Sequence, residues 1–181
     1  TGSYYLPFFA FRDVVRNSIV ENKVFDNDIY ELSTKYIKEN SIVIDAGANY
    51  GQLSILFSKV KPNVKVYAFE AYKYVSQILS KNVEINNSNV IVFNCILGDV
   101  SEKSLVISKS YLKEFNNYGS NFIELKNKDE QGDLVDAVKI DDLYINQEIS
   151  FMKIDVQGYD LKVLKGAEKT IKKNKMPIII E

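Results

Sequence analysis

Short continuous apolar runs recur along the chain and are separated by mixed polar segments. Runs of this length without a polar alternation are typical of strands that are buried on both faces of a parallel sheet. They occupy residues 42–44, 64–69, 90–93, 149–154 and 177–180. The pattern therefore predicts five parallel strands.

The segments between several of these runs have a helical period. Leu53, Leu56, Phe57 and Val60 follow the first run at spacings of i, i+3, i+4 and i+7, which places them on one face of a helix. The same spacing recurs approximately over residues 75–83 and 161–171. Alternation of strand and helix predicts an α/β fold with a doubly wound parallel sheet.

The regions before and between these units are less regular. Residues 26–38 begin with a capping aspartate and predict a leading helix, whereas we expect residues 14–24 to be extended. We divide the chain into an aromatic-rich N-terminal segment with its leading helix, 1–40, and a main domain, 41–181. The long connection from 97 to 149 contains strand-like stretches at 104–108 and 134–140 and a polar loop at 115–121, and a connection of this length is often functional.

Composition excludes several classes of protein. A formal net charge of −1 over 181 residues makes nucleic acid an unexpected partner. Histidine is absent, so any base must be Asp, Glu, Lys or Tyr, and Ser-His-Asp and Cys-His catalysts are excluded. Cys95, the lone cysteine, lies in an apolar run and is expected to be buried. No apolar run reaches membrane-spanning length, and we expect a cytoplasmic protein.

The loop "DAGANYG" follows the first predicted strand, where ligands bind in an open parallel sheet. Gly47 and Gly51 allow a tight turn and a close backbone approach to a ligand. A phosphate-binding P-loop is excluded because no lysine follows Gly51, and Asn49 weakens a dinucleotide fingerprint that requires glycine at its position. A cofactor without phosphate remains, with Asp45 orienting an amino or hydroxyl group.

Two further acids end predicted strands. Glu70 ends the second strand, where a carboxylate accepts hydrogen bonds from both ribose hydroxyls, so it favours a nucleoside-containing ligand. Asp155 ends the fourth strand and is expected to face the same crevice as Asp45. The alternative is that these acids only cap strands or bond the following turns.

Six segments follow one another from about 41 to 181: "VIDAGANYGQLSILFSK", "VYAFEA", "FNCILGD", "VKIDDL", "MKIDVQGYDLKVLKGAEKTIKK" and "MPIIIE". Together, in this order and spacing, they resemble the FkbM-type methyltransferases. The resemblance implies a class I (Rossmann-like) methyltransferase fold that binds S-adenosylmethionine and methylates a hydroxyl on a sugar, glycan or polyketide-like acceptor. The cofactor-binding positions that it implies are Asp45, Gly47, Ala48, Asn49, Tyr50, Gly51, Glu70, Ala71, Asn94, Cys95, Ile96 and Asp155.

The sequence departs from the family pattern at two points. Gln157 stands where many members have glutamate, so we expect no metal site there. The class I sheet has seven strands, whereas this chain ends at the fifth, and the fold therefore looks truncated after that strand. The exposed edge could be covered by a homo-oligomer contact or by the aromatic N-terminal segment.

Without histidine, Asp155 is the first candidate for the base that deprotonates the acceptor, with Tyr159 or an acid of the loop at 110–133 as substitutes. Residues 111–131 of this loop are expected to contribute to the pocket for the acceptor. Two other functions stay open: an inactive methyltransferase-like binding or assembly module, and an NAD-dependent oxidoreductase. Asn49 argues against the oxidoreductase, because a dinucleotide fingerprint has glycine at this position.

Overall fold

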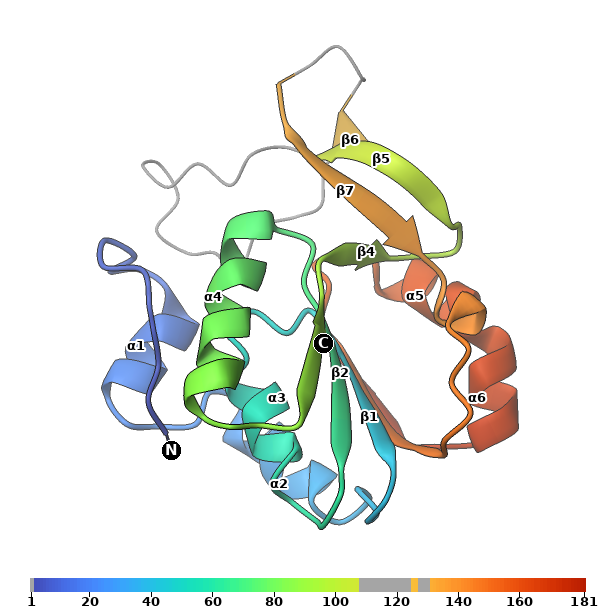
Figure 1. Cartoon of the computed structure of the whole chain (residues 1–181), viewed down its shortest axis with the longest axis horizontal. Helices are drawn as coiled ribbons and strands as arrows, with labels where there is room; N and C mark the ends of the chain where they lie inside the picture. Colours follow the sequence, from blue (N-terminus) through green and yellow to red (C-terminus); the bar gives the residue numbers. More distant parts are fainter. Residues whose placement is uncertain (1, 108–124, 127–130) are drawn as a thin grey trace.

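The computed structural model describes residues 2–107, 125–126 and 131–181. Its centre is a parallel sheet with the strand order β3-β2-β1-β8-β9 (Figure 1). The strands are β1 (Ile42–Ala46), β2 (Lys65–Phe69), β3 (Val90–Phe93), β8 (Ile149–Ile154) and β9 (Ile178–Ile180). Each predicted apolar run forms one of these strands, so the parallel five-stranded sheet is confirmed.

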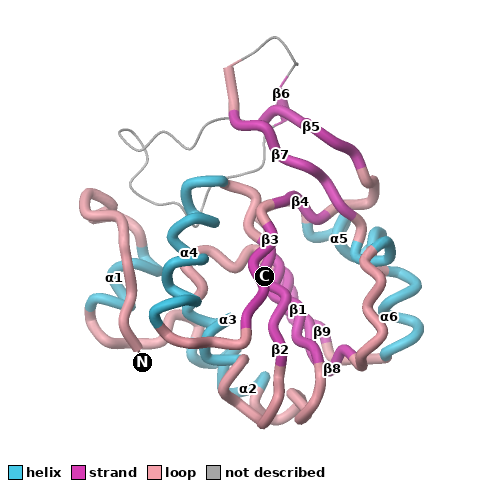
Figure 2. The backbone as a smooth tube through the Cα atoms, in the orientation of Figure 1, coloured by secondary structure: helices cyan, strands magenta, loops and turns pink. Residues whose placement is uncertain are grey.

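Helices cover both faces of this sheet (Figure 2). One face carries α3 (Gln52–Phe57) and α4 (Lys73–Ile85), and the other carries α5 (Asp160–Gly166) and α6 (Glu168–Asn174). Alternate side chains of the strands point to opposite faces, so Phe151 packs against Phe57 with ring centroids 5.8 Å apart, while its neighbour Met152 lies in the cluster with Val163. The doubly wound arrangement is therefore confirmed.

The N-terminal segment is helical where we expected it to be extended. Residues 14–24 contain α1 (Val14–Val20), which begins after Asp13, whose carboxylate accepts a hydrogen bond from the backbone N–H of Arg16 at 2.8 Å. Val15 and Ile19, one helical turn apart, are both buried. The expectation of an extended segment was wrong, because the N-cap and the i, i+4 packing determine the structure here. The leading helix α2 (Asn27–Ser33) is shorter than the predicted 26–38.

Buried hydrogen bonds join this segment to the main domain. The hydroxyl of Tyr50 donates to the Asp13 carboxylate at 2.8 Å, and both residues are fully buried. The amide nitrogen of Asn82, on α4, donates to the backbone oxygens of Tyr5 and Tyr50 at 3.1 and 2.9 Å. Helix α1 and the loop after β1 are thus fixed relative to one another.

The long connection between β3 and β8 forms a second, smaller sheet. It has the order β4-β7-β5-β6, with β4 (Cys95–Leu97), β5 (Glu102–Ile107), β6 (Leu125–Lys126) and β7 (Asp133–Val138). A 3-10 turn, η2 (Ile140–Asp142), then leads towards β8. The strand-like stretches at 104–108 and 134–140 correspond to β5 and β7, and Cys95 is buried as expected. The polar loop at 115–121 lies outside the described residues.

Strand β9 pairs only with β8 within the described part of the chain. Truncation of the sheet and a homo-oligomer contact at this edge therefore stay predictions. Among the described helices, none combines the length and the apolar content that a bilayer crossing requires.

We predict that Asn82→Ala destabilises the protein by roughly 1–3 kcal/mol, because the buried carbonyl of Tyr50 loses its side-chain donor. Urea unfolding followed by circular dichroism measures this loss. Asn86→Ala is the matched control, since Asn86 bonds to Ser3 at the exposed end of the same helix. Equal unfolding midpoints for the two variants would contradict the prediction.

Candidate functional site

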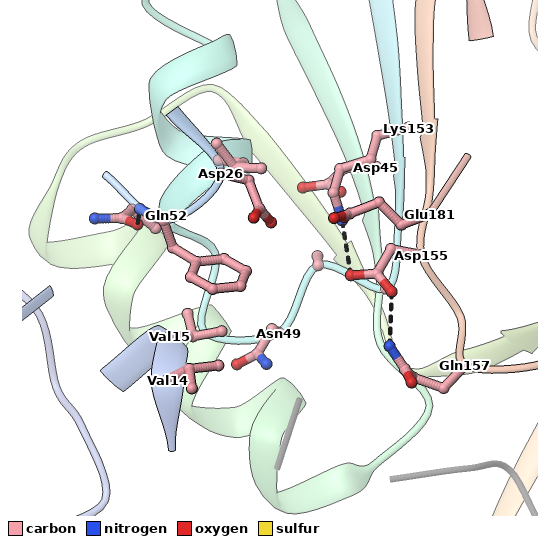
Figure 3. Close-up of a pocket in the computed structure, with 14 residues that line it drawn as sticks. Val14, Val15, Asp26, Asp45, Asn49, Gln52, Lys153, Asp155, Gln157 and Glu181 are labelled. Carbon is pink, nitrogen blue, oxygen red and sulfur yellow. Dashed lines mark hydrogen bonds and ion pairs between the residues drawn. The ribbon is translucent and has the colours of Figure 1, made fainter. Parts of the chain in front are cut away.

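A cavity of about 240 Å³ opens where the carboxyl ends of β1, β8 and β9 meet the N-terminal helices (Figure 3). Its wall is unusual in the number of charged groups that share a partly enclosed space. The lining residues are Val14, Val15, Phe25, Asp26, Asp45, Gly47, Ala48, Asn49, Gln52, Leu53, Lys153, Asp155, Gln157 and Glu181.

The loop after β1 is fixed between the two neighbouring strands. Gly47 and Ala48 donate their backbone N–H groups to the carbonyl of Phe69, each at 3.0 Å. Gly47 has φ +81°, and a Cβ at this position would lie 1.8 Å from the carbonyl oxygen of Asp155. Only glycine allows both the left-handed turn and this close approach. The first glycine of the motif is therefore needed where the chain after β1 passes the end of β8.

Asp45 is buried at the floor of the cavity, with 1% of its surface exposed. The hydroxyl of Ser54 donates to its Oδ2, whereas Oδ1 has no donor among the described residues. Burial raises the pKa of Asp45, and the nearby Lys153 and the Ser54 hydroxyl oppose that shift. Asp45 is thus a buried acid with one oxygen that is free to accept a hydrogen bond.

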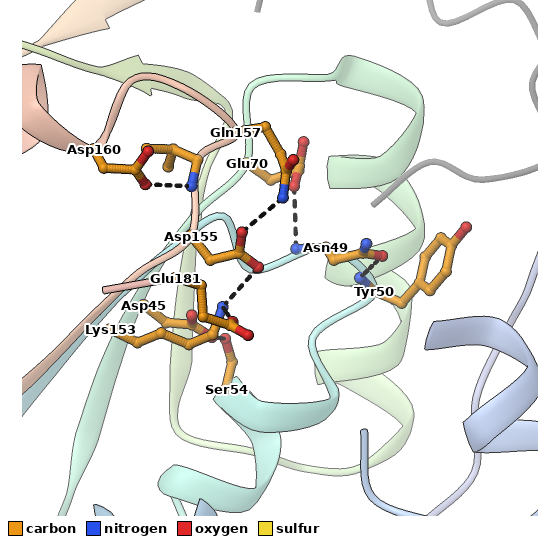
Figure 4. Close-up of polar contacts among 11 residues, drawn as sticks. Asp45, Asn49, Tyr50, Ser54, Glu70, Lys153, Asp155, Gln157, Asp160 and Glu181 are labelled. Carbon is orange, nitrogen blue, oxygen red and sulfur yellow. Dashed lines mark hydrogen bonds and ion pairs between the residues drawn. The ribbon is translucent and has the colours of Figure 1, made fainter. Parts of the chain in front are cut away.

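Lys153 lies beside Asp45 on β8 and is only 3% exposed. Its ammonium group is 3.2 Å from Oδ2 of Asp155 and 3.9 Å from Oε2 of Glu181 (Figure 4). Burial alone lowers the pKa of Lys153, but the carboxylates of Asp45, Asp155 and Glu181 outweigh burial and raise it. The ammonium group is therefore charged and is surrounded by acids from three strands.

Asp155 has a hydrogen-bond donor at each carboxylate oxygen. Lys153 donates to Oδ2, and the side-chain nitrogen of Gln157 donates to Oδ1 at 2.9 Å. The carboxylate is thereby held in one orientation at the edge of the cavity. Each oxygen retains a second lone pair, with which it can accept a bond from a ligand.

Glu70 lies next to the cavity and not in its lining. Its two carboxylate oxygens accept backbone N–H groups of Asn49 at 3.1 Å and of Tyr72 at 3.0 Å. Burial raises its pKa to about 7, and these two hydrogen bonds limit the rise. The side chain of Asn94 donates to the carbonyl oxygens of Glu70 and Ala71, both at 2.9 Å, and so holds the turn after β2.

The structure brings some of the predicted site residues together and leaves others apart. Those in the cavity lining are Asp45, Gly47, Ala48, Asn49 and Asp155. Those outside this lining are Tyr50, Gly51, Glu70, Ala71, Asn94, Cys95, Ile96 and Tyr159. Their roles stay predictions. Most of the loop at 111–131 lies outside the described residues.

Sequence reasoning did not select Asp26, Lys153 or Glu181, although all three line the cavity. A signal existed for Lys153, because a lysine inside the apolar strand "ISFMKI" must be paired when it is buried. Glu181 directly follows the last apolar run, as Asp155 follows the fourth. Asp26 gave no such signal, since it lies in a loop and the prediction used it only as a helix cap.

Metal ligation is a separate question for an acidic site of this kind. Over the described ranges, no group of three or more Asp, Glu, Cys or His side chains is arranged to hold a metal ion. The acids converge on the Lys153 ammonium group instead.

The chain is similar to known methyltransferases of fungi. It is 25% identical to "Methyltransferase sdnD" of Sordaria araneosa, in an alignment that covers 90% of this chain and 73% of that protein. It is 20% identical to "Methyltransferase 1" of Beauveria bassiana, with 82% of this chain and 66% of that protein covered. The chain thus spans about two thirds to three quarters of these relatives.

Similarity to solved structures is weak. A precorrin 8w decarboxylase of Methanobacterium thermoautotrophicum aligns with a TM-score of 0.49 at 13% identity, covering 84% of this chain and 61% of that chain. An S-adenosylmethionine-dependent methyltransferase of Aquifex aeolicus aligns with a TM-score of 0.39 at 20% identity, covering 57% and 54%. Scores at this level add no argument about function.

The match to a family model decides the assignment. Residues 45–181, well over half of the chain, match the methyltransferase FkbM domain, and this range contains both Asp45 and Asp155. The chain therefore belongs to the FkbM family of methyltransferases, whose cofactor is S-adenosylmethionine.

Proposed function

We propose that this chain transfers the methyl group of S-adenosylmethionine to a hydroxyl oxygen of a sugar, glycan or polyketide-like acceptor. The observation that carries the proposal is the cavity at the carboxyl ends of β1, β8 and β9, in which Asp45, Lys153 and Asp155 meet behind the glycine loop. Ligands of open parallel sheets bind at this edge. The kind of acceptor comes from the family resemblance of the sequence.

The residues of the cavity fit the charged methionine end of the cofactor. That end carries two positive groups, an ammonium and a sulfonium, and one negative group, a carboxylate. The lining offers carboxylates to the positive groups and the Lys153 ammonium group to the carboxylate. Asp45 lines the cavity, and its Oδ1 is a buried acceptor that has no donor among the described residues. A buried acceptor of this kind is costly unless a ligand or water bonds to it.

Glu70 is the residue that would accept the ribose hydroxyls. Its carboxylate lies directly behind the backbone of Asn49, beside the loop. The two backbone hydrogen bonds fix its orientation and leave one lone pair on each oxygen. Hydroxyl donors strengthen the charged form of a carboxylate, so cofactor binding is expected to ionise Glu70.

The bound cofactor supplies a methyl group on a positively charged sulfur, which departs as a neutral thioether. The residues of the chain mainly have to align the acceptor oxygen with that methyl group, and such positioning is a large part of catalysis. As the oxygen–carbon bond forms, the acceptor loses its hydroxyl proton. Asp155 is the proposed proton acceptor, because its carboxylate is fixed by Lys153 and Gln157 at the cavity edge.

We predict that the purified chain binds S-adenosylmethionine and S-adenosylhomocysteine and does not bind NAD. Glu70→Gln is expected to weaken both affinities at least tenfold, because the variant loses the charge-assisted bonds to ribose, which contribute about 1.5–3 kcal/mol. Isothermal titration calorimetry measures the affinities. Glu84→Gln, an exposed site on α4, is the matched control. A folded chain that binds neither ligand would favour the inactive module.

Stability of the free protein should also depend on Glu70. Its pKa is about 7 in the folded chain and near 4.5 when unfolded, so the folded state holds a proton that the unfolded state has lost between these values. The free energy of unfolding therefore falls as pH rises from 4.5 to 7, by at most about 1.4 kcal/mol per pH unit.

We predict that Glu70→Gln makes this pH dependence shallower between pH 5 and 7.5. Urea unfolding at several pH values tests the slope, not the absolute stability, because glutamine also loses one of the two backbone hydrogen bonds. Asp26, Asp45 and Glu181 have raised pKa values as well, so a smaller slope of the same sign remains in the variant. An unchanged slope would show that Glu70 does not titrate in this range.

Asp155→Asn tests the role of Asp155 as proton acceptor. We expect methyl transfer to fall at least a hundredfold, which is within the usual contribution of a positioned base, whereas cofactor affinity changes far less. Transfer of a labelled methyl group to a panel of hydroxylated acceptors gives the rate, and calorimetry gives the affinity. Asp99→Asn, an exposed acid, serves as control. Equal rates in both variants would remove Asp155 from the mechanism.

A further inference from the structure

Charge in the cavity is not balanced among the described residues that line it. The charged lining residues are four carboxylates and one ammonium group: Asp26, Asp45, Asp155, Glu181 and Lys153. Lys153 forms ion pairs with Asp155 and Glu181 and lies close enough to Asp45 to affect its pKa. The fourth acid, Asp26, has no ion pair with it. The lining therefore contains more negative charge than its one cation neutralises.

Asp26 stands apart from the other acids in position. It belongs to the N-terminal segment, between α1 and α2, and its carboxylate points into the cavity from the side opposite Asp155 (Figure 3). Its Oδ2 is inaccessible to solvent and accepts no hydrogen bond from the described residues. Asp45 Oδ1, in the same lining, is unpaired as well, in a residue that is 1% exposed.

Asp26 and Asp45 thus place in one cavity lining two buried acceptors that no described residue donates to, and this requires an explanation, because such groups are rare in native structures. Burial raises the pKa of Asp26, and the negative charge of Asp155 raises it further, against the opposing effect of Lys153. A cation in the cavity would offset the first two effects. The missing component is therefore a positively charged hydrogen-bond donor.

An ammonium group fits this description better than a metal ion. A metal ion needs three or more ligands around one point, and the described residues contain no such group. A primary ammonium group has three donors on a small positive centre and can bond to separate acceptors in different directions.

We propose that Asp26 is a cofactor-binding residue that accepts a hydrogen bond from the ammonium group at the methionine end of S-adenosylmethionine. The inference rests on the proposed function, since it requires that this end of the cofactor occupies the cavity. It assigns the N-terminal segment a direct part in ligand binding. The site is then completed by a residue outside the range that matches the family model, which begins at residue 45.

The test compares S-adenosylhomocysteine with an analogue in which a hydroxyl replaces the amino group, so that only the ammonium is lost. Both ligands are titrated by calorimetry into the wild-type chain and into Asp26→Asn and Asp26→Gly. Asp26 has φ +51°, which asparagine and glycine tolerate well, so both variants are expected to fold. Asp28→Asn, an exposed acid on α2 with the same change of charge, is the control.

We expect wild type to prefer S-adenosylhomocysteine over the hydroxyl analogue by about tenfold or more, the size of a charge-assisted hydrogen bond. The two Asp26 variants should lose most of this preference, mainly by binding S-adenosylhomocysteine more weakly, while Asp28→Asn keeps it. Unchanged preference in the Asp26 variants, or an equal loss of affinity for both ligands, would overturn the assignment.

Failure of the proposed function gives a different result. In that case the wild-type chain binds neither ligand, and the inference falls together with the function. If wild type binds both ligands and the Asp26 variants bind them as wild type does, the function stands and only the role of Asp26 is overturned. Thermal unfolding of each variant by circular dichroism shows that the compared chains are folded.

Discussion

The buried ammonium group of Lys153 determines how the functional end of the sheet is organised. Removing a charge from water costs several kcal/mol unless it is paired and hydrogen-bonded. Here the compensating carboxylates come from the ends of β1, β8 and β9, as Asp45, Asp155 and Glu181. One interior lysine thus requires three strand ends to remain together, and the cavity is the space that they enclose.

A second constraint is the close approach of the glycine loop to the turn after β8, and it supports the pairing of Lys153 with the carboxylates. Asp45 and Asp155 can face the same cavity only if the chain after β1 passes very close to the turn after β8. Gly47 permits that passage, because any Cβ there would meet the backbone of Asp155 at 1.8 Å. Packing at this junction and the proposed binding of the cofactor therefore depend on the same residue.

Much of the fold could be predicted from the sequence because its signals are local. The strands are continuous apolar runs, and α3 and α4 lie where the apolar residues follow a helical period, closely in α3 and approximately in α4. The error at residues 14–24 had a physical cause: the capping carboxylate of Asp13 and the burial of Val15 and Ile19 determine a helix where an extended segment was expected. Side-chain preference is weaker than a cap combined with a buried face.

The candidate site was only partly predictable, since its members come together through tertiary contacts. Acids at strand ends could be recognised one at a time, but no spacing in the sequence shows that Asp26 faces Asp155 across a cavity. Tyr50 illustrates the opposite case. It lies inside the motif, yet its hydroxyl bonds to the buried Asp13 and its ring is fully buried, so its visible contribution is to hold the N-terminal segment in place.

Asp155 and Asp26 face one cavity but differ in the hydrogen bonds that their carboxylates accept, and this difference suits different tasks. Both oxygens of Asp155 have protein donors, so its carboxylate is held in a fixed direction before any ligand arrives. Oδ2 of Asp26 accepts no hydrogen bond from the described residues, so the protein leaves its hydrogen-bonding capacity unused there. A fixed acid is suited to orienting an acceptor hydroxyl, and an unsatisfied one is suited to binding a cation. The same residue type can thus serve alignment on one wall and affinity on the other.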